Sequence, residues 1–370
     1  MPISTKRSST PPSANLSTAK KSPDAKSGPR GPLRIVTIGG GTGLSSLLKG
    51  LKKHASVEDP VISLTAVVTV TDDGGSSGRL RRDFAVLPPG DVRNCLVALA
   101  EEEALLSQLF QYRFTGGRGL KGHSFGNLFL TALTHLTGDF ASAVRFASGV
   151  LASCGEIIPS TAENVVITAK LHDGTLVSGE SNISKTRSPI REIRILPRRP
   201  QPLPEALAAI ASADLITLGP GSLFTSIIPN LLVAGIPQAI AASPALKVSI
   251  GNLMWQPGET VNFTASDHIR AMIRHTGLTG QARSQFLHYV VLNSQGIHPR
   301  QLGRYAAKQA LPVENDTAAL REMGLEILKA DLLCEGEKIR HDPAATAAIV
   351  LKLARLGRRR RQIEGARKSL

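Results

Sequence analysis

The first feature able to do chemistry is a glycine-rich run at residues 39–43, which includes Gly40, Gly41, Thr42 and Gly43. It stands between an apolar segment and a segment with leucines at helical spacing. Glycines let successive backbone N–H groups turn toward one anion, and a helix N-terminus adds a favourable dipole. The run predicts a phosphate site, and a purely structural turn is the alternative.

This run matches neither of the two best-known phosphate loops. The dinucleotide-binding pattern needs a glycine where Leu44 stands, and the Walker pattern needs Lys and then Ser or Thr directly after the last glycine. The absent glycine disfavours an NAD-type oxidoreductase, so we expect a phosphate cradle of a third kind.

Two adjacent acids, Asp72 and Asp73, begin a second loop at residues 71–78, after the apolar run 64–70. In doubly wound folds an acid at this place hydrogen-bonds a sugar hydroxyl, and two adjacent acids could also hold Mg²⁺ through water. An exposed Asp-Gly turn is the alternative. A serine nucleophile at Ser76 is disfavoured because acids precede it and a charged segment follows, where that motif needs a strand and an apolar helix.

A third loop, Gly219-Pro220-Gly221-Ser222, follows the apolar run 215–218 and repeats the glycine pattern of the first. Two such loops at the carboxyl ends of buried strands predict a ligand in the crevice between them.

Polar side chains in apolar surroundings form two further groups: Asp91, Arg93 and Asn94, and later His123 and Asn127. In a ligand site they would hydrogen-bond phosphate or sugar. Asp91 is equally well explained as a helix N-cap, and His123 as a hydrogen-bonded structural histidine.

These loops need strands and helices that place them at one edge of a sheet. Apolar runs predict strands at residues 33–38, 64–70, 215–218, 238–242, 287–292 and 325–332. Helical spacing predicts helices at residues 44–54, 91–99, 127–136, 139–151, 206–211 and 343–356. The alternation predicts an α/β fold with a mostly parallel sheet covered on both faces. Residues 165–171, 176–179 and 190–196 predict a small antiparallel insertion at about residues 160–200.

The net charge of +15 is concentrated at the two ends of the 370-residue chain. Residues 1–33 carry six Lys or Arg and one acid, and residues 352–370 carry eight and one. We predict a disordered basic tail at 1–32, one α/β domain at 33–350, and the end of the last helix with a basic tail at 351–370. Such tails meet nucleic acid, an anionic membrane or an acidic partner, or are solvated. The aromatic content of 4% disfavours nucleic acid.

Cys95, Cys154 and Cys334 lie among apolar neighbours without paired spacing, which is typical of buried thiols in a reducing compartment. The N-terminus lacks the apolar segment of a secretory signal. Four prolines interrupt the uncharged stretch 215–246, so it predicts no continuous membrane-spanning helix. The sequence therefore predicts a cytoplasmic protein without a membrane span.

Several long segments resemble the bacterial YvcK proteins, also called gluconeogenesis factors, over roughly residues 33–350. They are GGGTGLSSLLKGLK from Gly39, TDDGGSSGRLR from Thr71, PPGDVRNCLVALA from Pro88, FQYRF from Phe110, GLKGHSFGNL from Gly119, ADLITLGPGSLFTSIIPNLL from Ala213, QPGET from Gln256 and IRHDP from Ile339.

The resemblance implies a Rossmann-like, doubly wound fold shared with the 2-phospho-L-lactate transferases of deazaflavin cofactor synthesis. It implies a sensor of UDP-sugars, notably UDP-N-acetylglucosamine, that ties cell-wall precursor supply and cell shape to gluconeogenic growth. An unidentified protein partner of cell-wall precursor metabolism is implied, and a homo-oligomer is left open. A nucleotide-dependent transferase that holds Mg²⁺ on Asp72 and Asp73 is the alternative function.

By position, the first and third loops would hold the diphosphate and sugar, and Tyr305 and Arg340 match positions associated with UDP-sugar binding. Tyr305 offers a ring face for a base, and Arg340 a planar fork of donors. The alternative is that Tyr305 caps a surface helix and Arg340 pairs with Asp342. Trp255 departs from the family pattern, because a small polar residue is expected before QPGET. This departure bears on ligand choice if the position touches the sugar.

Overall fold

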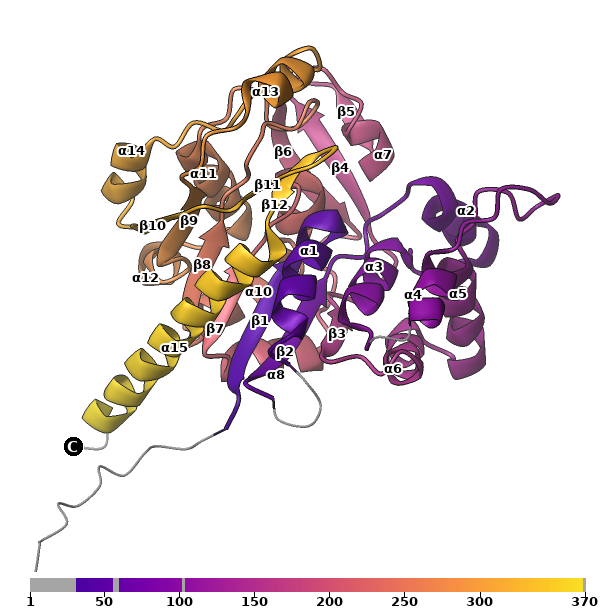
Figure 1. The fold of residues 1–370 in the computed structure, drawn as a ribbon, viewed down its shortest axis with the longest axis horizontal. Helices are drawn as coiled ribbons and strands as arrows, with labels where there is room; N and C mark the ends of the chain where they lie inside the picture. The colour runs from indigo at the N-terminus through magenta and orange to yellow at the C-terminus, as the bar shows by residue number, and fades with distance from the viewer. Residues whose placement is uncertain (1–30, 56–59, 102–103, 369–370) are drawn as a thin grey trace, which may run out of the picture. The chain divides into compact units, whose positions relative to one another are not determined.

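Seven strands form the main sheet of the protein. The computed structural model describes residues 31–55, 60–101 and 104–368. The strands are β1 (Leu33–Gly39), β2 (Ile62–Val68), β3 (Glu156–Pro159), β7 (Leu215–Leu218), β8 (Leu246–Ile250), β9 (Tyr289–Asn293) and β10 (Glu326–Ala330). Their order is β10-β9-β8-β7-β1-β2-β3, and all neighbouring pairs are parallel (Figure 1). The order reverses between β1 and β7, so the predicted doubly wound α/β fold is confirmed.

Helices cover both faces of this sheet. They are α1 (Gly41–Lys52), α2 (Gly75–Phe84), α3 (Gly90–Leu99), α4 (Ala104–Gln111), α5 (Phe125–Thr137), α6 (Phe140–Val150), α7 (Glu180–Ile183), α8 (Pro204–Ser212), the π-helix η1 (Leu223–Ile227), α9 (Ile228–Leu231), α10 (Ile236–Ala242), α11 (Ala265–Thr276), α12 (Gly280–Ser284), α13 (Pro299–Ala306), α14 (Thr317–Glu322) and α15 (Pro343–Lys368). Apolar residues of α1, α3 and α15 pack on one face, and those of α8 to α11 with η1 pack on the other.

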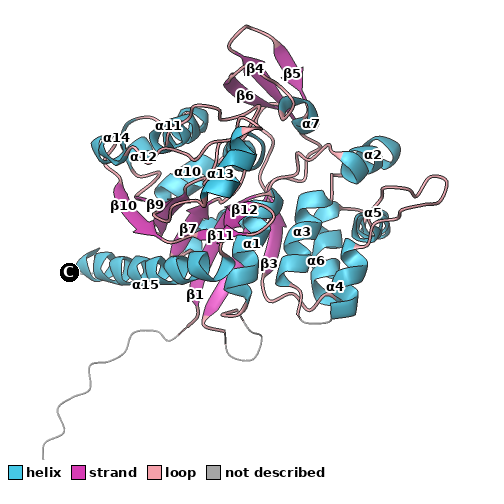
Figure 2. Cartoon of the chain, turned by 45° about the horizontal axis from the view of Figure 1, so that its top comes forward, coloured by secondary structure: helices cyan, strands magenta, loops and turns pink. Residues whose placement is uncertain are grey.

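Two small antiparallel sheets lie outside the main sheet. Strands β4 (Val166–Leu171), β5 (Leu176–Ser178) and β6 (Ile190–Leu196) form one, and α7 follows β5 in the chain, as Figure 2 shows. Strands β11 (Leu333–Glu335) and β12 (Ile339–His341) form a hairpin. The three-stranded sheet is the antiparallel insertion predicted from the sequence.

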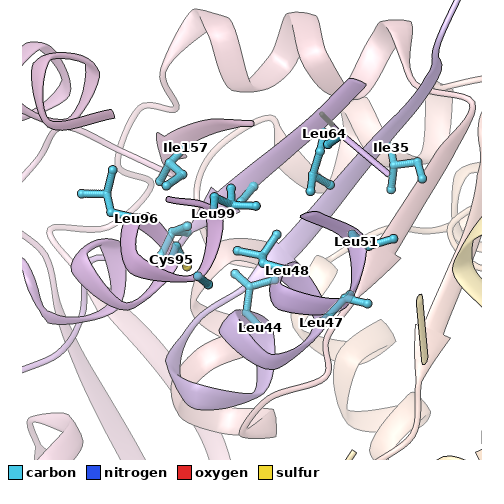
Figure 3. Packing of buried hydrophobic residues seen from close by; sticks show 14 of the residues in the cluster. Ile35, Leu44, Leu47, Leu48, Leu51, Leu64, Cys95, Leu96, Leu99 and Ile157 are labelled. Atoms are coloured by element: carbon cyan, nitrogen blue, oxygen red, sulfur yellow. The ribbon is translucent and has the colours of Figure 1, made fainter. Parts of the chain in front are cut away.

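The packing under α1 fixes the first glycine loop at the end of β1. Successive strand residues point to opposite faces, so Ile35 belongs to the apolar cluster under α1, whereas Val36 and Ile38 belong to the cluster on the other face. Burying one leucine contributes about 1.5–3 kcal/mol relative to leaving it exposed. The buried leucines of α1 that Figure 3 shows in this cluster are Leu44, Leu47, Leu48 and Leu51.

One predicted strand is wrong. Residues 238–242 lie in helix α10, and the strand that follows is β8. Pro237 stands in the first turn of α10, where its fixed φ favours a helix. Lys247 breaks the apolar pattern of β8, yet it is buried and its amine donates to the carbonyl oxygen of Ala241 at 3.2 Å.

Other boundaries also differ from the predictions. Strand β3 is a four-residue edge strand that ends in proline. It is not among the predicted strands, because its sequence contains no long apolar run. Helix α2 begins at Gly75, inside the second loop. Helix α3 begins at Gly90 with Pro89 at its N-cap, so the prediction of Asp91 as N-cap is wrong. Helix α15 continues to Lys368, through residues predicted to be a tail. The predicted disorder of residues 1–30 lies outside the described residues.

The three cysteines differ in exposure. Cys95 is buried, Cys154 is half-buried and Cys334 is exposed, so the prediction of a buried thiol is wrong for Cys334. Cys334 lies in β11, and a two-stranded hairpin leaves part of its surface to solvent.

Within the described part of the chain, no single helix is long and apolar enough to span a membrane. The bent pair 223–231 and 236–242, with 76° between its halves, passes that test of length and composition only when both halves are taken together.

Candidate functional site

A cavity of about 510 Å³ lies where β1 and β7 end and the strand order reverses. Doubly wound folds bind their ligands at this place. The cavity is bordered by the first and third loops, the segment after β8, α7, α13 and the β11–β12 hairpin. Its lining includes Gly40, Gly41, Thr42, Gly43, Glu180, Gly221, Ser222, Trp255, Gln256, Glu259, Tyr305, Lys308 and Arg340.

The first loop requires glycine at two positions, because other atoms lie too close behind its backbone for a Cβ. A Cβ on Gly40 would lie 2.5 Å from Asp91 Oδ2, and a Cβ on Gly43 would lie 2.6 Å from the carbonyl oxygen of Pro220. Gly41 has φ +64° and lines the cavity, with a serine hydroxyl at 3.4 Å as the nearest atom to a Cβ. Helix α1 begins here, so its positive dipole end lies at the cavity.

The third loop is tied to the segment after β8. Asn252 Nδ2 donates to the carbonyl oxygen of Gly221 at 3.1 Å, and Gln256 Nε2 donates to Ser222 Oγ at 2.7 Å. Gly221 and Ser222 line the cavity, whereas Gly219 has φ +80° and shapes the turn behind it. The two glycine loops therefore meet at one cavity.

Tyr305 and Arg340 reach the same cavity from far along the chain. The Tyr305 hydroxyl accepts a hydrogen bond of 2.8 Å from the backbone N–H of Ile339. In the described residues Arg340 forms no ion pair with Asp342, whose carboxylate instead accepts the backbone N–H of Ala345 at 2.7 Å. The alternative arrangement considered for Arg340 is therefore not formed.

The residue that departs from the family pattern faces the cavity. Trp255 lines it, and its indole N–H donates to the carbonyl oxygen of Phe263 at 2.9 Å, which holds the ring in place. Lys308 adds a cation to the same lining. A fixed aromatic ring at this position is therefore able to contact a ligand.

Two acids that are not among the predicted site residues also line the cavity. Glu259 accepts the backbone N–H of Phe224 and the hydroxyl of Thr225, both at 3.3 Å, and burial raises its pKa to about 7. Oε2 of Glu180 is buried and has no hydrogen-bond partner among the described residues. Burial, and then neighbouring carboxyl groups, raise the pKa of Glu180 well above its ordinary value. Glu259 lies in the QPGET segment, but no motif marks Glu180.

Asp91 lies directly behind the first loop. Its carboxyl group accepts a hydrogen bond from the backbone N–H of Gly41, and burial, followed by the charge of Asp72, raises its pKa to about 7. Asp91 therefore shapes the loop and does not cap α3.

The remaining predicted site residues, Asp72, Asp73, Arg93, Asn94, His123 and Asn127, do not belong to the cavity lining. Four of them form a hydrogen-bonded cluster that joins α2, α3 and α5, which favours the structural explanation for His123. The contacts run from Arg93 to Ser124 Oγ (2.5 Å) and Asn94 Oδ1 (2.7 Å), from His123 Nδ1 to Ser76 Oγ (3.0 Å), and from Asn127 Nδ2 to Ser77 Oγ (3.3 Å).

Both acids of the second loop bind backbone donors. Asp72 Oδ1 accepts the N–H of Gly74 at 2.9 Å, and Asp73 Oδ1 accepts the N–H of Ser181 in α7 at 2.8 Å. Across the described residues, no group of three or more His, Cys, Asp or Glu is arranged to hold a metal ion. One oxygen of each carboxylate therefore positions local backbone, and Mg²⁺ binding by this pair stays a prediction.

The chain is similar to known proteins over most of its length. The family profile described as "2-phospho-L-lactate transferase CofD" matches residues 35–333. The gluconeogenesis factor of Bacillus subtilis is 44% identical over 321 residues, which are 86% of this chain and 98% of that protein. A Nostoc sp. relative is 49% identical over 325 residues, which are 87% of this chain and 69% of that protein. The crystal structure of a UPF0052 family member from Bacillus halodurans has 44% identity and a TM-score of 0.80, and the match covers 86% of this chain and 98% of that one.

Proposed function

Since this chain belongs to the CofD family and to its gluconeogenesis-factor (YvcK) branch, we propose that it is a regulator that binds a UDP-sugar, with UDP-N-acetylglucosamine as the ligand. In this proposal it works in the cytoplasm and changes its contacts with a protein of cell-wall precursor metabolism when the ligand is bound. It thereby links carbon metabolism to cell-wall precursor supply and cell shape.

One observation carries this proposal: a single cavity unites both glycine loops with Tyr305 and Arg340. Its volume of about 510 Å³ lies within the range of small-molecule sites. Backbone N–H groups and the N-terminus of α1 suit the diphosphate, and Arg340 and Lys308 supply positive charge. The Tyr305 ring offers a face for the uracil base, and stacking of this kind is worth about 1–3 kcal/mol.

A binding role without turnover fits the second loop. Phosphoryl-type transfer needs groups that stabilise charge at the reacting centre, but Asp72 and Asp73 hold backbone N–H groups and lie outside the cavity lining. The CofD match keeps a nucleotide-dependent transferase as the second candidate. Release of UDP from a UDP-sugar with Mg²⁺ present, above that of an Asp72→Asn/Asp73→Asn variant, would favour this second candidate.

The test of the proposed function is a calorimetric titration of the full chain with UDP-N-acetylglucosamine, with and without Mg²⁺. We expect saturable binding at one site per chain and a ligand-dependent rise in melting temperature, because a ligand that binds the native state stabilises it. ADP-glucose serves as the control ligand, since it keeps a diphosphate and a hexose but changes the base and lacks the N-acetyl group. Failure of UDP-N-acetylglucosamine to bind, or equal binding of ADP-glucose, would contradict the proposal.

A further inference from the structure

The lining of the cavity combines groups of opposite character. The first loop, Arg340 and Lys308 provide N–H donors and positive charge, whereas Glu180 and Glu259 provide carboxyl groups. A ligand that fills the cavity must therefore present an anionic part to the first set and hydrogen-bond donors to the second.

Glu180 is the member of the second set that lacks a partner. Glu259 already accepts two hydrogen bonds from protein groups, but Oε2 of Glu180 is buried and accepts none from the described residues. Buried polar atoms in native proteins normally have a partner, so an orphaned acceptor at a cavity points to a donor on the ligand.

The charges around Glu180 determine which part of a ligand fits there. Asp91, Asp72, Glu259 and Asp73 all act on it as like charges. A diphosphate placed beside Glu180 would lie among carboxyl groups and oppose their ionisation, whereas a hydroxyl or amide N–H would find an acceptor oxygen. The diphosphate is therefore expected at the glycine loops, with the uncharged, donor-bearing part of the ligand at Glu180.

Glu180 is held in place from two directions. It is the first residue of α7, whose Ser181 N–H donates to Asp73 Oδ1 at 2.8 Å. Thr186, shortly after α7, donates its hydroxyl to the carbonyl oxygen of Gly258 at 2.9 Å, in the segment that also carries Glu259. The small antiparallel sheet thus delivers a fixed carboxyl group to the cavity, and Asp73 is a positioning residue.

We propose that Glu180 determines specificity for the sugar: its carboxyl group accepts a hydrogen bond from a sugar hydroxyl or amide N–H of a nucleotide-sugar. Through this contact the β4–β6 insertion distinguishes a nucleoside diphosphate that carries a sugar from one that does not. The inference rests on the proposed function, because it requires a UDP-sugar in this cavity.

The test compares calorimetric affinities of the full chain for UDP-N-acetylglucosamine and for UDP. The variants are Glu180→Ala and the isosteric Glu180→Gln. The matched control is Glu192→Gln, a half-buried carboxylate of β6 in the same small sheet, which pairs with Arg194 at 2.9 Å and does not line the cavity. We expect wild type and the control to prefer the UDP-sugar over UDP. Glu180→Ala should reduce that preference at least tenfold, and Glu180→Gln, which keeps an acceptor oxygen and the side-chain volume, should reduce it less.

Each outcome separates the inference from the proposed function. Equal losses for both ligands would mean that Glu180 acts only on the structure, and an unchanged preference would mean that it does not contact the sugar; either result overturns the inference. A wild-type protein that binds UDP and the UDP-sugar equally overturns the inference alone. A wild-type protein that binds neither overturns the proposed function as well. Should Glu180→Ala not fold, the preference of Glu180→Gln decides the question.

Discussion

The hydroxyl of Tyr305 accepts a hydrogen bond of 2.8 Å from the backbone N–H of Ile339, the neighbour of Arg340. This contact ties helix α13 to the β11–β12 hairpin, and residues 34 positions apart in the chain become one wall of the cavity. Tyr305 is thus able to act in two ways, through its ring toward a base and through its hydroxyl on the strand that carries Arg340.

Tyrosine variants separate these two roles. Tyr305→Phe removes only the hydrogen bond to Ile339, whose net worth is about 1 kcal/mol, so we expect UDP-N-acetylglucosamine affinity to fall by no more than about fivefold. Tyr305→Ala also removes the ring and should weaken binding at least tenfold. Calorimetry gives the affinities, and the melting temperature of the unliganded protein should stay near that of wild type, because Tyr305 is only half-buried.

Arg340→Ala should likewise weaken UDP-N-acetylglucosamine binding at least tenfold. Its side chain is exposed and, among the described residues, has no ion pair with Asp342, so the unliganded protein should not lose melting temperature. Ligand-induced stabilisation should shrink with affinity. Full stabilisation retained in both Tyr305→Ala and Arg340→Ala would place the nucleotide elsewhere.

Two glycine substitutions in the first loop should each abolish ligand binding, but for different reasons. In Gly41→Ala the new methyl group enters the cavity and meets only the Ser226 hydroxyl, at an ordinary contact distance of 3.4 Å, so we expect loss of ligand binding with only a small loss of stability, about 1–2 kcal/mol from the positive φ. In Gly43→Ala the Cβ would lie 2.6 Å from the carbonyl oxygen of Pro220, so the two loops must separate. We expect that variant to lose both binding and melting temperature.

Gly277→Ala is the matched control for Gly41→Ala. Gly277 has the same φ of +64°, and nothing lies within 4 Å of its Cβ position, but it ends α11 and does not line the cavity. It should show the same strain and normal ligand binding. Equal UDP-N-acetylglucosamine affinity in Gly41→Ala and Gly277→Ala would show that the first loop is only a structural turn.

The sequence predicts where the two glycine loops meet because the signal is local in the chain. Glycines that directly follow buried strands mark positions where backbone must approach something closely, and parallel strands bring their carboxyl ends to one edge. The ends of β1 and β7 are adjacent in the sheet, so Gly43 and Gly221 come together. The same reasoning predicts the fold class.

The sequence does not predict Glu180 because nothing local distinguishes a cavity acid from a surface acid. Its place depends on how the small sheet packs against the segment after β8, through contacts such as Thr186 to Gly258. Asp72 and Asp73 have the residue type and position of ligand groups, but they lie outside the cavity lining and one oxygen of each accepts a backbone N–H group. Asn-, Asp- and Ser-rich turns often use their side chains in this way.

Glu259 predicts a specific pH dependence of stability. Burial raises its pKa to about 7 in the folded chain, above its ordinary value of 4.5. Between these values the folded protein keeps a proton that the unfolded chain has lost, so the stability that this group contributes is present below pH 4.5 and is lost as the pH rises through 7.

Glu259→Gln isolates this contribution. The difference in unfolding free energy, wild type minus variant, should fall between pH 4.5 and 7 by up to about 1.4 kcal/mol per pH unit and level off above pH 7. Urea unfolding at several pH values measures it. Wild type and Glu259→Gln should show parallel curves of unfolding free energy against pH if Glu259 titrates normally, and that result would contradict the prediction.

Asp214 anchors the C-terminal helix to the start of the sheet. It is 1% exposed and precedes β7, and Arg358 donates to it at 2.6 Å while Arg361 and Arg34 lie at 3.7 and 3.9 Å. Arg361 also donates to the carbonyl oxygen of Ser212 at 2.7 Å. Part of the basic C-terminal run is therefore structural, although the sequence alone indicated a solvated tail.

Two truncations of α15 test this anchoring role. A chain that ends at Gly357 loses Arg358 and Arg361 and leaves the buried carboxylate of Asp214 with Arg34 alone, so we expect a loss of unfolding free energy on the order of 3 kcal/mol. A chain that ends at Gln362 keeps both arginines and should retain most of its stability. Both should bind UDP-N-acetylglucosamine as wild type does at a temperature where they are folded, because no described residue after Gly357 lines the cavity. A chain without residues 1–30 should also bind normally, because the glycine loops, Tyr305 and Arg340 all lie after residue 30. Thermal melts and calorimetry on the three chains give the comparison.

Equal melting temperatures for the two C-terminal truncations would show that the arginines do not anchor the helix. A tenfold loss of affinity in any of the three chains would show that an end of the chain contributes to the site.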